Sequence, residues 1–128
     1  MNFQQIAAFL RNGTEEQTIT APDIRVLSGW SKSTLVSYNA AVKKFVTFKK
    51  ESKEGCYRLP ITTRNVYEFV TWAGWGEGNK GTNNILASSL TKYLHGLKAW
   101  HTFHNADYPH ATAKRVKLML KASGQQDA

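Results

Sequence analysis

The last third of the chain contains all four histidines, and their spacing raises the question of metal binding. His101, His104 and His110 lie close to Asp107 in the sequence, and imidazole and carboxylate groups are common zinc ligands. At about 100° per residue, however, His101 and His104 fall on the apolar side of a helix expected over residues 88–104. A zinc site needs converging ligands with supporting hydrogen bonds. We therefore expect His101 and His104 to be packing residues and His110 a surface residue, with no metal site and no cofactor.

Residues that could carry out acid–base or nucleophilic catalysis do not converge in this sequence. It contains neither Gly-x-Ser-x-Gly nor His-Glu-x-x-His, and its few acidic residues are dispersed. Gly74, Gly76, Gly78 and Gly81, together with Lys80, do not form a phosphate-binding loop, because no buried strand precedes them and no Gly-Lys-Ser/Thr follows. They predict a mobile connection instead. The sequence thus indicates no self-contained enzyme, no catalytic residues and no small-molecule substrate.

The charge of the chain points to a polyanionic partner. The 128 residues carry a formal net charge of +8, and their number is typical of one domain. Residues 1–30 contain two arginines against three carboxylates, a net of −1, so the basic excess begins at Lys32. A basic surface favours nucleic acid first, then an acidic membrane surface or an acidic protein.

Cysteine content and hydropathy bear on location. Cys56 is the only cysteine, which excludes an internal disulfide and is typical of a reducing compartment. No stretch approaches the ~20 apolar residues of a membrane span, and the N-terminus lacks a cationic segment followed by an apolar run. We expect an intracellular protein without membrane contact, nuclear if the source is eukaryotic and otherwise cytoplasmic or nucleoid-associated.

Apolar residues repeat at helical spacing in five segments, and no segment alternates as a strand does. The segments are a short helix over 2–11, followed by main helices over about 31–50, 62–73, 88–104 and 109–124. Ser31 to Thr34 and Thr62 or Thr63 offer N-caps. The fold should be all-α and compact, with four main helices and an additional short N-terminal helix.

Breaks in these patterns divide the chain into three parts. Asn12-Gly13 should stop the first helix, and residues 14–30, with Pro22, are predicted to be a linker. Residues 1–30 are thus an N-terminal helix and linker, and this separable helix could pack on the main body or dock on a neighbouring molecule. The core domain is predicted over 31–124. Gly124 is a plausible stop, which leaves 125–128 as a polar tail.

Two of the predicted helices carry a polar, cationic stripe beside their apolar face. The first stripe comprises Lys32, Val36, Asn39, Lys43 and Lys50, and the second Ser88, Thr91, Lys92, His95, Lys98 and Thr102. Lysines supply salt-dependent attraction to phosphates, and hydroxyl groups fix register on them. Asn39, Lys92 and His95 could reach base edges, and Val36 could meet a thymine methyl. The alternative is that both stripes only keep a helical bundle soluble.

The order of several short motifs resembles a known family. Three motifs follow one another as in the N-terminal core-binding domain of tyrosine recombinases. They are Ser33-Thr34-Leu35-x-x-Tyr38 with Phe45, then Val66-x-x-Phe69-x-x-Trp72, then Ser89-Leu90-Thr91-x-Tyr93-Leu94-x-x-Leu97-x-Ala99-Trp100-His101. These are the lambda-integrase-type site-specific recombinases and integrases. The resemblance covers about residues 28–124. It implies a SAM-like helical domain that forms half of a clamp around duplex DNA.

The resemblance implies a set of DNA-contacting residues. By position they are Lys32, Ser33, Val36, Asn39, Lys43, Ser88, Ser89, Lys92 and His95. It also implies that the N-terminal and last helices, with Leu118, offer surfaces for homo-oligomer contacts. The family cuts DNA with a tyrosine, arginines and a histidine of a separate domain, and neither His-x-x-Arg nor a tyrosine after Tyr108 occurs here. We therefore expect double-stranded DNA binding without cleavage.

Two other classes of function stay open at this point. A helical protein-interaction or oligomerisation module would bind a partner through residues 3–10 and the last helix. An RNA or single-strand binder would need exposed aromatic side chains on a basic face, for which Phe48 and Phe103 are the candidates.

Overall fold

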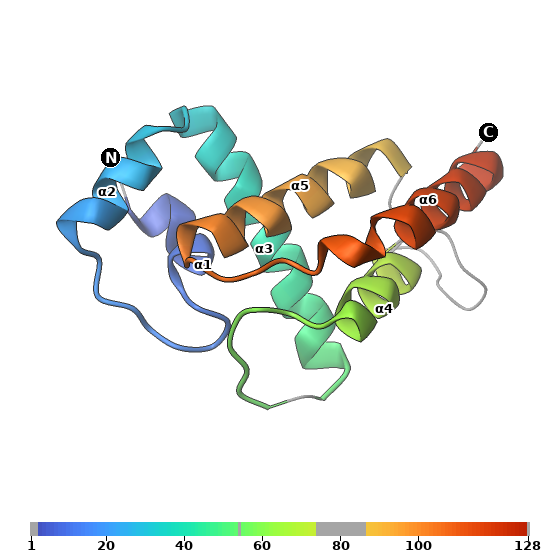
Figure 1. Ribbon diagram of the computed structural model, residues 1–128, viewed down its shortest axis with the longest axis horizontal. Helices are drawn as coiled ribbons and strands as arrows, with labels where there is room; N and C mark the ends of the chain where they lie inside the picture. The colour runs from blue at the N-terminus through green and yellow to red at the C-terminus, as the bar shows by residue number, and fades with distance from the viewer. Residues whose placement is uncertain (1–2, 54, 74–86, 128) are drawn as a thin grey trace.

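The computed structural model describes residues 3–53, 55–73 and 87–127, and it confirms the all-α fold (Figure 1). In chain order the helices are η1 (Phe3–Ile6), α1 (Ala7–Leu10), α2 (Ala21–Ser28), α3 (Lys32–Glu51), α4 (Thr63–Ala73), α5 (Ala87–Phe103), η3 (His110–Thr112) and α6 (Ala113–Asp127). Among these residues there is no strand, only an isolated bridge between Asn12 and Glu15. The predicted glycine-rich connection over 74–81 lies outside the described residues. No helix within the described ranges is long and apolar enough to span a membrane.

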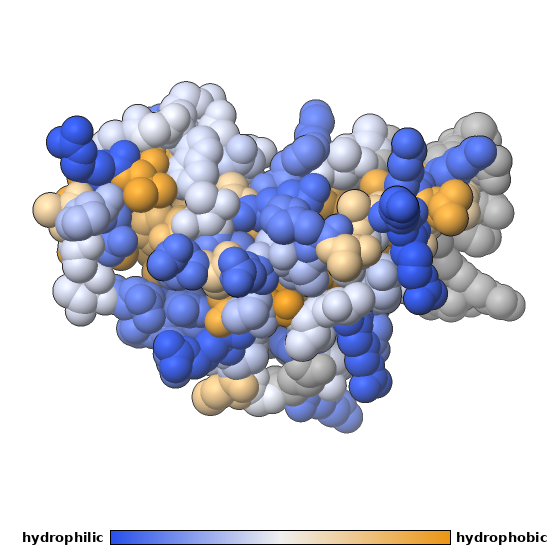
Figure 2. Space-filling model, viewed as in Figure 1, coloured by the Kyte–Doolittle hydropathy of each residue, from blue (hydrophilic) through white to orange (hydrophobic). Residues whose placement is uncertain are grey.

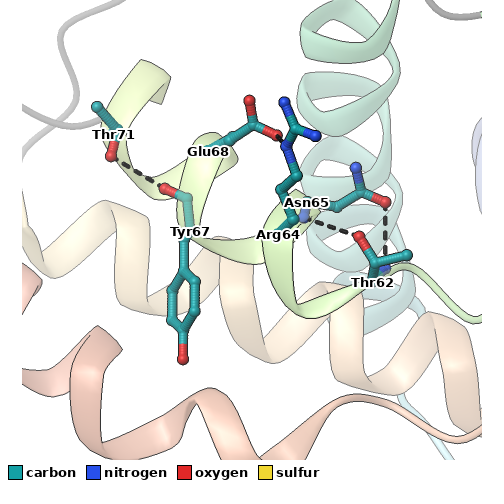
Figure 3. A network of polar contacts seen from close by, with 6 residues as sticks. All are labelled: Thr62, Arg64, Asn65, Tyr67, Glu68 and Thr71. Carbon is teal, nitrogen blue, oxygen red and sulfur yellow. Dashed lines mark hydrogen bonds and ion pairs between the residues drawn. The ribbon is translucent and has the colours of Figure 1, made fainter.

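Two of the main helices begin where their capping residues predict. Ser31 Oγ accepts a hydrogen bond from Thr34 N–H at the start of α3. At the start of α4, Thr62 Oγ1 accepts from Asn65 N–H while Asn65 Oδ1 accepts from Thr62 N–H (Figure 3). These reciprocal bonds satisfy amide groups that the first turn of a helix leaves unpaired.

α3 and α5 form the centre of the molecule and cross one another, as Figure 1 shows. The crossing is close because Gly96 of α5 lies against Ala41 and Tyr38 of α3; a Cβ atom at position 96 would stand 2.5 Å from Ala41 Cβ. Trp100 and Phe45, one from each helix, are fully buried with ring centroids 6.1 Å apart. The core of the fold therefore fixes the relative position of α3 and α5.

The N-terminal segment is part of this core, so of the two positions left open for the first helix it packs on the main body. Phe9 is fully buried, with its ring 5.4 Å from that of Phe103 and stacked on Tyr38. Trp100 Nε1–H donates to the carbonyl of Arg11 at 2.8 Å. Gly13 has a φ of +65° and would clash with the Tyr57 carbonyl if it carried a Cβ. Buried aromatic packing and backbone hydrogen bonds thus attach residues 3–14 to the main body.

Two boundaries also differ from the expected ones. Residues 21–28 form α2 rather than a linker, because Thr20 and Asp23 make a capping box and Pro22 is tolerated in the first turn of a helix. Leu27 anchors α2 in the core. At the other end, α6 continues to Asp127, through Gly124 and the predicted tail. A single glycine lowers helix stability without necessarily ending a helix.

Candidate nucleic-acid interface

Two hollows lie on the solvent side of the α3–α5 crossing, and we call the surface around them the crossing face. The first hollow, about 360 Å³, lies between the start of α3 and the middle of α5 and is lined by Ser33, Thr34, Ser37, Tyr38, Lys92 and His95. The second, about 250 Å³, follows α3 toward its end and is lined by Ala40, Lys43, Lys44, Thr47 and Tyr93. The crossing thus joins two separate stretches of sequence into one polar surface.

The structure brings together some of the predicted contact residues. Ser33 of α3 shares the first hollow with Lys92 and His95 of α5. Lys43 lines the second hollow. These four side chains come from helices whose relative position the core determines, so they lie on a rigid surface.

The other predicted contact residues lie outside both hollows. Lys32 and Val36 are exposed on α3, with Val36 42% accessible. Ser88 is exposed and Ser89 half-buried in the first turn of α5. None of these four lines either hollow. They border the crossing face rather than form it.

Asn39 does not lie on the crossing face, and the structure corrects its predicted position. Its side chain is only 7% exposed, and Oδ1 accepts a 2.9 Å hydrogen bond from the N–H of Phe9. The helical wheel placed Asn39 beside Lys43, but α1 covers this side of α3. Asn39 therefore has a structural partner in α1.

Several side chains of the crossing face were missed. They are Thr34, Ser37, Lys44, Thr47 and Tyr93, all lining the two hollows. Ser33, Ser37, Lys44 and Thr47 repeat at helical spacing, but the wheel alone could not show that α1 would cover one flank of the polar stripe and leave this flank open. The exposed stripe of α3 is therefore turned toward α5.

The charge of the crossing face is positive. Lys43, Lys44 and Lys92 line the hollows, and no carboxylate is among the lining residues. Lys44 Nζ lies 5.1 Å above the Trp72 ring, an arrangement that restrains the side chain while keeping its charge. With the hydroxyl groups of Ser33, Ser37 and Thr47, the surface offers donors and cations to a ligand rich in anionic oxygen.

His101, which is buried, and His104, which is half-buried, have structural roles, as predicted. His101 is 1% exposed; its Nδ1–H donates to the Leu97 carbonyl, and Nε2 accepts from Ile61 N–H, which requires the neutral ring. His104 Nε2–H donates to the Phe9 carbonyl. Burial lowers the pKa of both imidazoles, against the opposing effect of these carbonyls. No group of three or more potential metal ligands occurs within the described part of the chain.

Comparison of the chain with protein-family models, with curated proteins and with solved structures gives no match.

Proposed function

We propose that this chain binds double-stranded DNA through the crossing face, in the manner of the core-binding domain of a tyrosine recombinase or integrase. The observation that carries the proposal is the close crossing at Gly96: hydroxyls of α3 lie beside Lys92 and His95 of α5 in the first hollow, and Lys43 and Lys44 of α3 lie beside Tyr93 of α5 in the second. The motif order and the net charge of +8 agree with it.

Each group on the crossing face has a role in this proposal. Lys43 and Lys44 neutralise phosphates, which gives affinity that weakens as salt rises. Hydroxyls of Ser33 and Ser37 bond phosphate oxygens and fix the register of the protein on the duplex. Lys92 and His95 are the donors nearest to base edges, and Val36, at the border, suits a thymine methyl.

The proposal assigns binding to this chain and cleavage to other residues. In the family that the chain resembles, the nucleophilic tyrosine and its arginine and histidine partners belong to a separate domain. The activity proposed here is therefore DNA recognition within recombination or integration, with no cofactor required.

A competition experiment tests the proposal. The chain is titrated against labelled duplex DNA in the presence of unlabelled duplex, single-stranded DNA or RNA, at several salt concentrations. We expect duplex to compete best, and we expect Lys43→Gln and Lys92→Gln each to reduce the log–log salt slope by about 0.9. The matched control is Lys117→Gln on α6, which removes the same charge from an exposed position outside the hollows. Equal competition by all three nucleic acids, or a wild-type slope of zero, would refute duplex recognition.

A protein-interaction module is the second candidate, because large apolar side chains are exposed on α6 and in the N-terminal segment, where this module would bind a partner. Leu118 on α6 is 67% accessible and Phe3 is 39% accessible. Figure 2 shows hydrophobic residues on the visible surface only as separate patches among hydrophilic ones. Self-association that survives without DNA and is lost in Leu118→Ser would favour this function.

The aromatic residues that favoured an RNA or single-strand binder are not exposed. Phe48 and Phe103, the aromatic residues on which it depended, are both buried in the core. Stacking of bases requires accessible ring faces.

A further inference from the structure

A groove of about 580 Å³ runs between the N-terminal segment and α3, on the flank of α3 away from the crossing with α5. We call it the N-terminal groove. One wall comes from residues 4–14 and the other from α3. Its lining residues are Gln4, Gln5, Ala7, Ala8, Arg11, Gly13, Thr14, Asn39, Lys43, Val46, Thr47 and Lys50.

The N-terminal groove is cationic. Arg11, Lys43 and Lys50 line it, and no carboxylate is among its lining residues. Arg11 Nε forms an exposed ion pair with Glu16 at 2.9 Å, and Glu16 lies outside the lining. Because that pair uses Nε, the terminal guanidinium nitrogens remain for a second anionic partner.

The walls of the groove are held in place by hydrogen bonds from three different parts of the chain. Asn39 Oδ1 accepts from Phe9 N–H, and Trp100 Nε1–H donates to the Arg11 carbonyl. Asn12 Oδ1 accepts from Leu59 N–H. A ligand entering this groove meets a preformed site, so little ordering free energy opposes binding.

The spacing of the cations along α3 suits an extended ligand. Lys43 and Lys50 are seven residues apart, which is about 10 Å along a helix. A single phosphate group does not cover that length, whereas a DNA strand presents successive phosphates along its backbone, each about 3.4 Å further along the duplex axis. Ala7, Ala8 and Val46 add an apolar strip, which suits the C–H edges of sugars between phosphates.

The groove is continuous with the crossing face. Lys43 and Thr47 line both the N-terminal groove and the second hollow. From this continuity, the charge and the cation spacing, we infer that the N-terminal groove holds a phosphodiester strand that flanks the part of the duplex on the crossing face. The inference rests on the proposed function and extends the contact from two helices to the N-terminal segment, with Arg11 and Lys50 as phosphate contacts.

The test compares salt slopes for three double variants on one duplex. Arg11→Gln/Lys50→Gln removes the two cations found only in the groove, Lys43→Gln/Lys92→Gln alters the crossing face, and Lys117→Gln/Lys121→Gln is the control with the same charge loss on α6. We expect the groove variant to reduce the slope by about 1.8, with the ranking of duplex sequences unchanged. The control should change the slope by less than about 0.5, because its charges make no direct phosphate contact. Thermal melting verifies that each variant is folded.

Three outcomes would overturn the inference, and the first two are distinguishable from failure of the proposed function. If the groove variant behaves like the α6 control while the crossing-face variant lowers the slope, DNA binding stands and the groove does not take part. If a nucleoside monophosphate or inorganic phosphate displaces duplex from the wild type but not from the groove variant at matched phosphate concentration, the groove is a small-anion site. If the wild type itself has no salt slope, the proposed function fails, and the groove assignment fails with it.

Discussion

Substituting Gly96 by alanine tests whether α3 and α5 cross as closely as the structure indicates. The added Cβ would lie 2.5 Å from Ala41 Cβ and 3.3 Å from Tyr38 Cα. Carbon atoms pack best at about 3.5–4.0 Å, so the helices must separate locally by about 1 Å or other side chains must move. The crossing face depends on this separation, because its first hollow is lined by both helices.

The magnitude is obtained from a double-mutant cycle. Overpacking in a core costs about 1–3 kcal/mol. Replacing glycine by alanine within a helix, by contrast, stabilises the helix by about 1 kcal/mol through intrinsic propensity. The stability of the single variant Gly96→Ala therefore combines two opposing contributions and cannot separate them. A double-mutant cycle combines Gly96→Ala with Ala41→Gly. The change in helix propensity at each position is the same whether or not the other position is substituted, so these contributions cancel in the coupling free energy. Removing the Ala41 methyl relieves the 2.5 Å contact, and we expect a coupling free energy of about 1–3 kcal/mol.

The assay is urea denaturation of the wild type, both single variants and the double variant, followed by duplex binding of each folded protein. We expect Gly96→Ala to weaken duplex binding and Ala41→Gly to restore part of it in the double variant. Zero coupling, with Gly96→Ala stabilising the protein as in an exposed helix, would refute the close crossing.

Three further predictions follow from buried polar groups and one cap. Asn39→Ala should destabilise the fold by about 1–3 kcal/mol in urea denaturation, because Phe9 N–H loses its hydrogen-bond partner. The order of affinities for different duplex sequences should stay the same. A changed order of affinities without destabilisation would contradict the structural role of Asn39. Stability should fall as pH drops below about 6.5, the ordinary pKa of an unfolded histidine, because burial lowers the folded pKa of His101 and His104 and the unfolded chain then binds more protons. The slope contributed by His101 can reach at most about 1.4 kcal/mol per pH unit, which corresponds to one proton. It should disappear from the pH profile of His101→Gln, and an unchanged profile would count against the neutral ring. Thr62→Ala should cost about 1 kcal/mol through loss of the α4 cap, as measured by thermal melting against Thr63→Ala, and equal effects of the two would contradict the cap.

Local patterns in the sequence were sufficient to predict the main helices. Ser31 and Thr62 are capping residues whose effect acts within one turn, and the periodic apolar residues that follow them require a buried face. The same reasoning correctly assigned His101 to the core, because its position on the wheel is apolar whatever covers it.

α2 was missed although its signal was present. Thr20-Ala21-Pro22-Asp23 is a capping box with proline in the first turn, but a short helix with Ile24 and Val26 exposed has no clear apolar period. The fixed φ of Pro22 is compatible both with the predicted linker and with the first turn of a helix, so the proline alone does not distinguish them.

The errors at the candidate site have a different origin. A helical wheel gives the direction of Asn39 but not the neighbour it meets, and here that neighbour is Phe9, thirty residues away in the sequence. Likewise Ser37 and Lys44 became part of the crossing face only because α5 packs beside them through Gly96. Long-range packing decided which flank of the polar stripe remained open.

Binding of duplex DNA by the crossing face can be observed in a titration of the ¹⁵N-labelled chain with a duplex of mixed sequence, followed through the backbone amide signals of the protein. We predict that the largest shifts fall on residues 33–47 of α3 and 91–98 of α5, are weakened by added salt, and are reduced in Lys43→Gln/Lys92→Gln. Shifts concentrated on α6 and α2 instead, or no shifts at low salt, would contradict duplex binding by the crossing face.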